Sequence, residues 1–244
     1  MDNDDTGIGQ VLTRREALAL LGAGGLVVLS GGGLLAPAPR GVAAAPMCVA
    51  RPQQTEGPFF VDERLQRSDI RGDPTDGSVR AGALLQLTFQ VSRIAGAACT
   101  PLAGAVVDIW HCDHLGAYSD TRDARFNTAG KKFLRGYQVT GADGVARFTT
   151  IYPGWYQGRA VHIHFKIRSA PSAGRGFDFT SQLYFDDAMT DRVHAQPPYA
   201  ARGQRNQRNP ADMLFRNGGS QLVLDVKPDG PGYAGVFAVA LQTA

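Results

Sequence analysis

The alternation of apolar and polar residues is the feature of this sequence that most constrains its fold. In the segment 85–92, four large apolar residues alternate with four polar ones. A period of two is typical of a strand with one buried face, whereas an amphipathic helix repeats about every 3.6 residues. Eight short runs carry the strand pattern: Leu85–Val91, Ala105–Trp110, Leu134–Val139, Val145–Ile151, Val161–Ile167, Phe179–Phe185, Leu222–Val226 and Val236–Leu241. The sequence therefore predicts an all-β fold, a β-sandwich of about eight strands with long loops.

Turn residues separate several of these strands. The segment 141–144 (Gly-Ala-Asp-Gly) predicts a hairpin loop, and 228–232 predicts a tight turn. The longest irregular segment, 186–217, is rich in Pro, Arg, Gln and Asn, and a loop of that length is either functional or mobile. Three of its arginines could steer an anionic substrate, although a solvated loop is the simpler interpretation: Arg202, Arg205 and Arg208.

The composition excludes several classes of protein. Hydrophobic residues make up 43% of the chain, which is enough for a packed core, and 25 Lys and Arg against 22 Asp and Glu give a net charge of +3. This balance requires neither a nucleic acid nor an anionic membrane as partner. Only a stretch near the N-terminus is apolar enough to enter a bilayer, so a polytopic membrane protein is excluded.

That N-terminal stretch predicts an export signal. The paired Arg14 and Arg15 precede a weakly hydrophobic, glycine-diluted run, 19–36, and small residues follow at 43–45. Paired arginines in this position resemble a twin-arginine signal, which in bacteria carries folded proteins through the twin-arginine export machinery. An uncleaved anchor helix is the alternative, but six glycines within 22–33 make a poor helix.

Cleavage after the signal divides the chain in two. Residues 1–45 form the expected twin-arginine-type signal, and residues 46–244 form one β-sandwich domain. The mature protein is then expected in the periplasm, the cell wall or the medium of a bacterium, without stable membrane anchoring. Its three cysteines, Cys48, Cys99 and Cys112, allow one disulfide and one remaining thiol, or three buried thiols, and the sequence does not select the pair.

A pair of histidines in one predicted strand is the main candidate for chemistry. In the segment 159–167 the odd positions from 161 on are large and apolar, so they should face the core, and His162 and His164 then share the opposite face. Such a pair lies about 6.5–7 Å apart along a strand, close enough to bind one metal ion. Two polar residues on a solvated face are the alternative interpretation. Gln182 and Tyr184 occupy the same alternation on a following strand.

The surrounding residue types limit the metal. No Cys-x-x-Cys or His-Glu-x-x-His motif accompanies the pair, so the sequence gives no support to the familiar zinc sites, whereas copper stays open. Tyrosines are close in sequence, and a tyrosine binds a metal only as phenolate, which requires a strongly Lewis-acidic ion at neutral pH. Imidazole together with phenolate suits ferric iron best.

Taken together, these motifs resemble the intradiol ring-cleavage dioxygenases, which include catechol 1,2-dioxygenases and protocatechuate 3,4-dioxygenases. The resemblance extends from about residue 55 to 185 and rests on the order and spacing of seven motifs: Thr55–Phe60, Pro101–Trp110, Gly116–Tyr118, Arg135–Thr140 with Asp143-Gly144, Thr150–Tyr156, the Arg-x-x-His-x-His segment from Arg159 to His164, and Ser181–Phe185.

The resemblance implies a site and an activity. The family holds non-haem Fe(III) with two tyrosinates and two histidines, which correspond here to Tyr118, Tyr156, His162 and His164. Tyr156 corresponds to the ligand that leaves when the catechol chelates. By the same resemblance, Arg159 lies over the ring and stabilises negative charge, and Gln182 lies beside it. The substrates are then a catechol and O2, and oxygen insertion between the two hydroxyl-bearing carbons gives a cis,cis-muconate-type product. We expect the iron between the sheets and the loops at one end of the sandwich.

Other interpretations of the same residues stay open. The segment 104–150 also resembles transthyretin-like β-sandwich modules, which bind ligands without catalysis. Only five residues separate Tyr156 from His162, where family members carry a longer insert, so we expect an open substrate pocket, which suits bulky aromatic catechols too. His111 and His114 could bind a metal of their own, although surface or supporting roles are the simpler interpretation.

Overall fold

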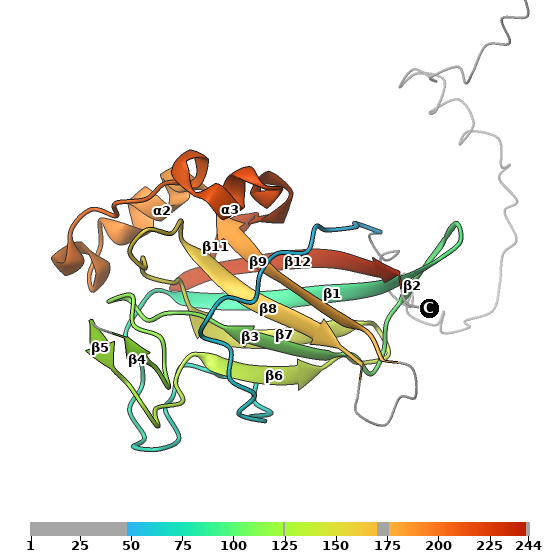
Figure 1. Cartoon of the computed structure of the whole chain (residues 1–244), viewed down its shortest axis with the longest axis horizontal. Helices are drawn as coiled ribbons and strands as arrows, with labels where there is room; N and C mark the ends of the chain where they lie inside the picture. The colour runs from blue at the N-terminus through green and yellow to red at the C-terminus, as the bar shows by residue number, and fades with distance from the viewer. Residues whose placement is uncertain (1–47, 124, 170–175, 243–244) are drawn as a thin grey trace, which may run out of the picture. The chain divides into compact units, whose positions relative to one another are not determined.

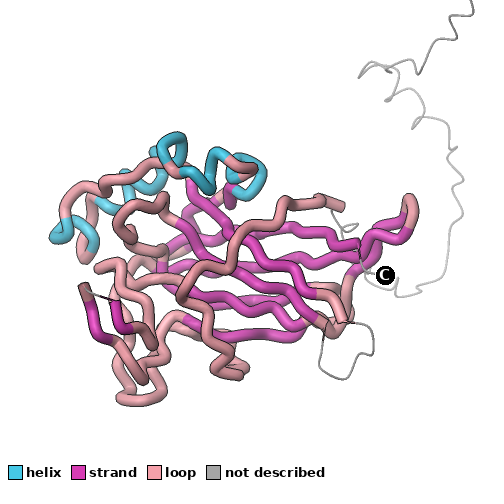
Figure 2. Tube along the Cα trace, viewed as in Figure 1, coloured by secondary structure: helices cyan, strands magenta, loops and turns pink. Residues whose placement is uncertain are grey.

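The computed structural model describes residues 48–123, 125–169 and 176–242, and within them the chain folds as two packed β-sheets. The expected signal at 1–45 lies outside the described residues. The orange to red colours of the helices in Figure 1 place them late in the chain, and Figure 2 shows them along one side of the strands. None of the helices in the described part has the length and apolarity needed to cross a bilayer. The prediction of an all-β sandwich is confirmed.

Each sheet has five strands, and a separate two-stranded ribbon lies at one end. The first sheet contains β1 (Leu84–Ala95), β2 (Ala98–Pro101), β7 (Val145–Ile151), β11 (Val226–Asp229) and β12 (Gly232–Gln242). The second sheet has the order β10 (Val223–Leu224), β9 (Asp178–Phe185), β8 (His162–Arg168), β3 (Val106–Trp110) and β6 (Arg135–Val139). The ribbon pairs β4 (Arg122–Asp123) with β5 (Phe126–Asn127).

The core lies between the two sheets and follows the predicted alternation. On β1 the apolar residues of the alternating run are almost fully buried, and so are the odd positions of β8. Phe89 of β1 and Phe237 of β12 meet Phe165 of β8, with ring centroids 5.3 and 5.4 Å apart. Burial of each such side chain stabilises the fold by about 1.5–3 kcal/mol. These contacts fix which face of β8 points away from the core.

Two connections differ from the sequence predictions. The segment 141–144 turns tightly but is not a hairpin within one sheet, because β6 pairs with β3 whereas β7 pairs with β1. The run predicted as one strand at 222–226 is two short strands, since the chain crosses from one sheet to the other at Asp225. Strands β2, β4 and β5 escaped prediction because they are short and polar.

The segment 186–217 is not the irregular loop that its composition predicts. It contains α2 (Asp187–His194), the 3₁₀ turns η1 (Tyr199–Arg202) and η2 (Asn209–Ala211), and α3 (Met213–Arg216), with η3 (Gly219–Leu222) after it. The side chain of Asp186 caps α2 by accepting a hydrogen bond from the Met189 amide at 2.8 Å. Each helix is too short to show a clear 3.6-residue pattern, which is why composition alone predicted a loop.

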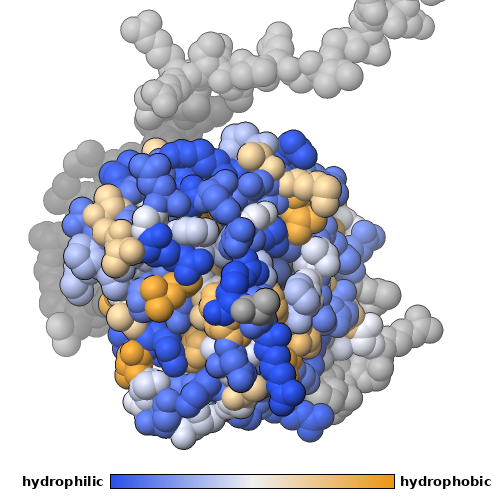
Figure 3. Space-filling model, turned by 60° about the vertical axis from the view of Figure 1, so that its left-hand side comes forward, coloured by the Kyte–Doolittle hydropathy of each residue, from blue (hydrophilic) through white to orange (hydrophobic). Residues whose placement is uncertain are grey.

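Exposed apolar side chains are scattered over the described surface. The large ones are Val61, Val79, Leu115, Val139, Met213 and Val236. Figure 3 shows one side of the molecule as mostly hydrophilic, with small apolar areas between polar residues. Isolated apolar residues of this kind are normal on soluble domains and do not mark a docking surface.

One disulfide joins the start of the described chain to β2. Cys48 pairs with Cys99, with their Cα atoms 5.7 Å apart, and Cys112 is a buried free thiol. This pairing is one of those that the cysteine count allowed. The bond closes a loop with a sequence separation of 51 residues. Chain-entropy arguments give a cross-link over such a loop a stabilisation of about 4 kcal/mol, with about 2–4 typical in practice.

We therefore expect Cys99→Ser to lower the free energy of unfolding by about 2–4 kcal/mol in urea titrations of the oxidised protein. Cys48→Ser should lower it equally, and the double variant should be no less stable than either single one. Non-reducing peptide mapping provides the check on the pairing, and a peptide that joined Cys112 to either partner would contradict it.

Candidate active site

The two histidines of β8 lie on the outer face of the second sheet. Because Val161 and Ile163 point into the core, His162 and His164 point to the opposite side. Both imidazoles therefore lie on the side of the sheet that faces away from the core, as the alternation predicts. Each histidine is nevertheless only 3% exposed, so this is not the solvated sheet face of the alternative interpretation.

The N-terminal segment 51–60 covers this face by crossing the second sheet. The amide of Gln54 donates to the Thr180 carbonyl on β9 at 3.0 Å, and the side-chain amide of Gln182 donates to the Thr55 carbonyl at 3.0 Å. Gly57, with φ of +71°, passes directly over the His164 ring, where a Cβ atom would lie 3.2 Å from Cε1. A larger residue at 57 would strain the backbone and press on the ring, so glycine allows this close cover.

Three donor atoms converge beneath this cover. The hydroxyl oxygen of Tyr118 lies 3.1 Å from Nε2 of His162, which lies 3.0 Å from Nε2 of His164. Nδ1 of His162 is 2.7 Å from the Ala160 carbonyl and donates to it, so its Nε2 presents a lone pair. Nδ1 of His164 is buried without a hydrogen-bond partner in the described chain. This cluster matches the donor set of a metal site with nitrogen and oxygen ligands.

Electrostatics keep both imidazoles neutral. Burial, followed by the nearby Arg159 charge, lowers the pKa of His162 to about 3. Burial lowers the pKa of His164 well below its usual range too, with His162 as the next cause. Burial also raises the pKa of the Tyr118 phenol well above 10. Neutral imidazoles are ready to donate lone pairs, whereas the phenol needs a strong Lewis acid to ionise at neutral pH.

The cluster depends on the tyrosine for its third donor. Within the described residues, no group of three or more His, Cys, Asp or Glu side chains is arranged to bind a metal ion. Tyr118 is buried and its ring stacks on Phe59, with centroids 4.5 Å apart. Its carbonyl accepts a hydrogen bond from Thr128 Oγ1 at 2.5 Å, which fixes the loop that presents the phenol.

Tyr156 is close to the cluster, but its hydroxyl points elsewhere. Its ring lies 5.8 Å from the Tyr118 ring and 5.4 Å from Phe59, between centroids. The hydroxyl donates to Asp123 at 2.9 Å and accepts from Arg125, so the β4–β5 ribbon holds it. Burial and the Asp123 contact raise its pKa. The structure therefore brings together three of the four predicted ligands and places the fourth beside them, with its oxygen bound to the ribbon.

Arg159 and Gln182 meet as the sequence predicts. Nη2 of Arg159 donates to Gln182 Oε1 at 2.6 Å and to the Tyr184 hydroxyl at 3.4 Å. The register of β8 and β9 pairs His164 with Gln182 and His162 with Tyr184, which places these four side chains on one face. The guanidinium thus lies at the edge of the histidine pair, where it can stabilise negative charge on a bound molecule.

Asp212 belongs to the same site and was missed from the sequence. Its carboxylate, 1% exposed, accepts from Arg159 Nε at 2.9 Å and from the Ala160 amide at 2.7 Å. Burial opposes its ionisation, but the hydrogen bonds from Ala160 and the Arg159 charge outweigh that effect and lower its pKa. The one local signal was a helix cap, an aspartate before the apolar residues 213–215.

The histidines at 111 and 114 do not form a second pair. His111 is buried, and its Nε2 lies 2.7 Å from Thr150 Oγ1 while its Nδ1 lies 2.8 Å from the Cys112 carbonyl. Burial lowers the pKa of His111 to about 4. His114 instead packs edge-on against Tyr199, with ring centroids 6.3 Å apart. Each ring therefore packs or hydrogen-bonds with different neighbours, and the two histidines do not face a common metal position.

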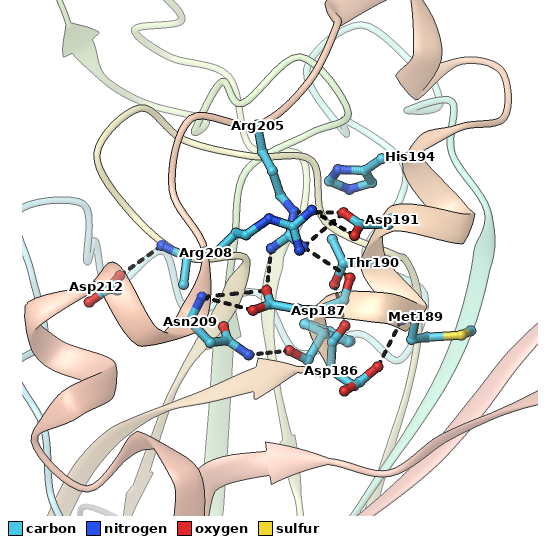
Figure 4. A network of polar contacts seen from close by, with 12 residues as sticks. Asp186, Asp187, Met189, Thr190, Asp191, His194, Arg205, Arg208, Asn209 and Asp212 are labelled. Carbon is cyan, nitrogen blue, oxygen red and sulfur yellow. Dashed lines mark hydrogen bonds and ion pairs between the residues drawn. The ribbon is translucent and has the colours of Figure 1, made fainter.

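The three arginines considered for substrate steering each contact a neighbouring side chain. Arg205 forms ion pairs with Asp187 and Asp191, and its side chain is only 4% exposed. Arg208 adds a second ion pair to Asp191 (Figure 4). Arg202 lies over the Trp155 ring, 4.2 Å from its centroid. The contacts of Arg205 stabilise the fold of the segment, whereas Arg208 keeps an exposed side chain and Arg202 has an aromatic ring, not a carboxylate, as its partner.

The β-sandwich thus presents a buried tyrosine oxygen and two imidazole nitrogens together on the outside of one sheet, a donor set that could bind a metal ion. The family model described as "Dioxygenase" (Dioxygenase_C) matches residues 55–202, more than half of the chain. The chain therefore belongs to this family, the intradiol ring-cleavage dioxygenases.

Characterised relatives agree with this assignment. The chain is 28% identical over 177 residues to catechol 1,2-dioxygenase 1 of Acinetobacter lwoffii, a match that covers 60% of this chain and 52% of the relative. It is 29% identical over 153 residues to a chlorocatechol 1,2-dioxygenase of Rhodococcus opacus, with 54% of each covered. The chain thus spans about half the length of these relatives.

Two solved structures cover more of the molecule. An intradiol ring-cleavage dioxygenase from Tetranychus urticae is 30% identical with a TM-score of 0.68, over 80% of this chain and 95% of that one. The dioxygenase domain of a dioxygenase carbohydrate-binding protein fusion from Streptomyces sp. SirexAA-E is 32% identical with a TM-score of 0.56, over 80% of this chain and 99% of that one. The described sandwich is therefore similar to nearly the whole of each of these chains.

Proposed function

We propose that the protein is a non-haem Fe(III)-dependent intradiol dioxygenase that cleaves a catechol-type ring with O2 to a cis,cis-muconate-type product. One observation carries this proposal: three possible ligand atoms lie together. Tyr118 Oη is 3.1 Å from His162 Nε2, which is 3.0 Å from His164 Nε2. Family membership supports it, and the alternative of a transthyretin-like binding module would not need this cluster.

The residues present fit ferric iron. Two neutral imidazoles, whose Nε2 atoms face each other, and the phenol oxygen of Tyr118 form a mixed nitrogen and oxygen donor set, which suits an iron ion. Tyr118, His162 and His164 would hold the ion, and Tyr156 would complete the set when its hydroxyl leaves Asp123 and Arg125. Bound there, Fe(III) supplies the Lewis acidity that binds a catecholate and the electron transfer that lets its ring react with O2.

The protein's own groups then have distinct tasks. Arg159, held by Gln182 at Nη2, presents a fixed positive charge beside the ring and stabilises the negative charge that develops on it. The ribbon residues Asp123 and Arg125 hold the Tyr156 hydroxyl, with its proton directed to Asp123 Oδ2. The ribbon therefore gives Tyr156 a stable place away from the histidines when a substrate occupies the site.

We also propose that residues 1–45 are a twin-arginine-type signal and that residues 46–244 act outside the bacterial cytoplasm. The paired Arg14 and Arg15 support this, and so does the Cys48–Cys99 disulfide, because such bonds persist in oxidising compartments. N-terminal sequencing of protein recovered from outside the cytoplasm tests the cleavage near residue 45.

A visible absorption spectrum with an iron assay, recorded before and after addition of catechol, tests the enzymatic proposal. We expect a broad tyrosinate-to-iron charge-transfer band that shifts when catechol binds, followed under air by the ultraviolet absorbance of a muconate. A Tyr118→Phe variant, which keeps the ring but removes the ligand oxygen, is the matched control and should lose most of the band. A parent protein that stays colourless after ferric reconstitution would favour the binding module.

A further inference from the structure

The carboxylate of Asp212 connects two parts of the candidate site. Its Oδ2 accepts hydrogen bonds from Arg159 Nε and from the Ala160 amide, at 2.9 and 2.7 Å. Its Oδ1 caps α3 by accepting from the amides of Leu214 and Phe215, at 2.7 and 3.1 Å. A carboxylate that is 1% exposed and has four donors is held in a single orientation, because any rotation would leave a buried donor unpaired.

The first consequence concerns the orientation of Arg159. Asp212 fixes the Nε edge of the guanidinium, while Gln182 and Tyr184 fix Nη2. A planar guanidinium bound along two of its edges cannot turn about its own axis. In the described chain these bonds use Nε and Nη2, which leaves Nη1 as the donor available to a bound molecule.

The second consequence concerns His162. The backbone of Ala160 makes two bonds through the peptide groups on either side of its Cα atom: its N–H donates to Asp212, and its carbonyl accepts the Nδ1–H of His162, each at 2.7 Å. A histidine whose Nδ1–H is bound to a fixed carbonyl keeps Nε2 as the lone-pair nitrogen. Asp212 is therefore connected through one backbone residue, Ala160, to the imidazole whose Nε2 faces Tyr118.

The segment that carries Asp212 is itself held firmly. The Asp212 amide bonds to the Arg208 carbonyl at 3.1 Å, and the Asn209 side chain donates to the Phe185 carbonyl at 2.8 Å, at the end of β9. The ion pairs of Arg205 with Asp187 and Asp191 join this turn to α2, as Figure 4 shows. These hydrogen bonds and ion pairs hold the segment 186–217 so that the Asp212 carboxylate lies beside Arg159 and Ala160, just before β8.

We propose that Asp212 is a positioning residue of the active site, which fixes the Arg159 guanidinium and the backbone at Ala160, next to His162, through one carboxylate oxygen. It contacts neither the reacting atoms nor a metal ligand directly. The proposal rests on the proposed function for the roles of Arg159 and His162, whereas the four hydrogen bonds of Asp212 are made by the chain itself.

Asp212→Asn is the first test, because the amide can still cap α3 with its oxygen. The NH2 group that replaces Oδ2 then faces two N–H donors and cannot bind either. We expect kcat with catechol to fall about 10–100-fold, the range found for groups that orient a metal ligand or catalytic group, with KM within about threefold of the parent value. Unchanged kcat and iron affinity in a folded Asp212→Asn protein would overturn the proposal.

Asp186→Asn is the matched control, since Asp186 caps α2 in the same way but has no bond to Arg159 or Ala160. It should leave kcat within about twofold of the parent. A double-variant cycle adds a second criterion: Arg159→Ala combined with Asp212→Asn should lower kcat by less than the product of the two single losses, because both changes remove the Arg159–Asp212 interaction. Independent, multiplicative losses would contradict a positioning role exerted through Arg159.

A measurement on the metal-free protein separates this proposal from the proposed function. In ¹H–¹⁵N NMR spectra the Arg159 Nε–H should exchange slowly with water, since it is bound to a buried carboxylate, and Asp212→Asn should abolish this protection. If the parent lacks catechol cleavage but shows protection that the variant loses, the positioning role holds and the proposed function fails. A rapidly exchanging Nε–H in the parent overturns the positioning role whether or not the variant folds.

Discussion

A His162→Ala variant should lose at least about 100-fold in iron affinity and show no charge-transfer colour. Removal of a group that merely orients a metal ligand already costs about 10–100-fold, and His162 lies at the centre of the cluster, within 3.1 Å of Tyr118 Oη and 3.0 Å of His164 Nε2. Its loss leaves Tyr118 Oη and His164 Nε2 without the nitrogen that lies between them. Competition with a chelator, followed by iron analysis, measures the change.

Loss of iron must be distinguished from loss of fold in this experiment. His194→Ala is a suitable control, because His194 is also a buried histidine with one backbone hydrogen bond, to the Pro153 carbonyl at 2.9 Å, yet it belongs to α2. Both variants should unfold at a lower temperature, since each leaves a cavity and an unpaired carbonyl. Only His162→Ala should fail to bind iron. Iron binding of parent strength by His162→Ala would contradict the ligand assignment.

The histidine pair was predictable because its signal is local. Alternation along one strand determines which face each side chain takes, and the large apolar residues at 161, 163, 165 and 167 could only face the core. The same reasoning placed Gln182 and Tyr184 beside the pair, since they share the parity of the neighbouring strand. What the alternation does not reveal is what covers the outer face, because the cover comes from a segment about 100 residues earlier in the chain.

The features missed from the sequence all depend on contacts between distant segments. Sheet membership of β6 and β7 depends on their partners β3 and β1, and the intervening turn has the same residues in either topology. The disulfide pair depends on the meeting of Cys48 with β2. Asp212 lies 53 residues from Arg159, and its local sequence indicates only a helix cap. Local patterns therefore predicted the strands and the ligand face, whereas the supporting groups required the tertiary structure.

The direction of the Tyr156 hydroxyl also depends on residues distant in the sequence. The sequence assigns Tyr156 a place among the ligands through its motif, and the fold does bring its ring to Tyr118. The final direction of the hydroxyl depends on Asp123, the last residue of β4, and on Arg125, in the turn before β5, and no periodicity could predict strands of two residues. The ligand role of Tyr156 stays a prediction, and the spectra of the proteins with and without catechol address it.

Arg159→Ala should keep its iron but lower kcat for catechol by about 100–1,000-fold. Arg159 bonds to no member of the cluster, since its hydrogen bonds in the described chain run to Asp212, Gln182 and Tyr184. The metal ligands therefore stay in place when it is removed. A fixed cation beside the ring lowers the energy of the anionic transition state, and removal of one such preorganised group typically costs this factor in kcat.

The substitution also leaves the Asp212 carboxylate without its cationic partner. Asp212 is nearly fully buried, whereas the Arg159 side chain is 21% exposed, so we expect some loss of stability together with a higher pKa of Asp212. Arg159→Lys controls for this effect, because a lysine restores the positive charge but cannot bind Asp212 and Gln182 with one planar group. It should recover stability more fully than kcat.

The two readouts must separate for the assignment of Arg159 to hold. Steady-state kinetics with catechol at saturating O2 should show the loss in kcat, while iron content and the charge-transfer band of the substrate-free protein stay at parent levels. Because a cation that acts only on substrate binding would raise KM and spare kcat, an unchanged kcat with a raised KM would assign Arg159 to binding alone. If both Arg159→Ala and Arg159→Lys lost iron, Arg159 would be part of the structure that holds the metal site. That result would contradict the prediction, in which the guanidinium stabilises charge on the substrate ring and the iron ligands do not depend on it.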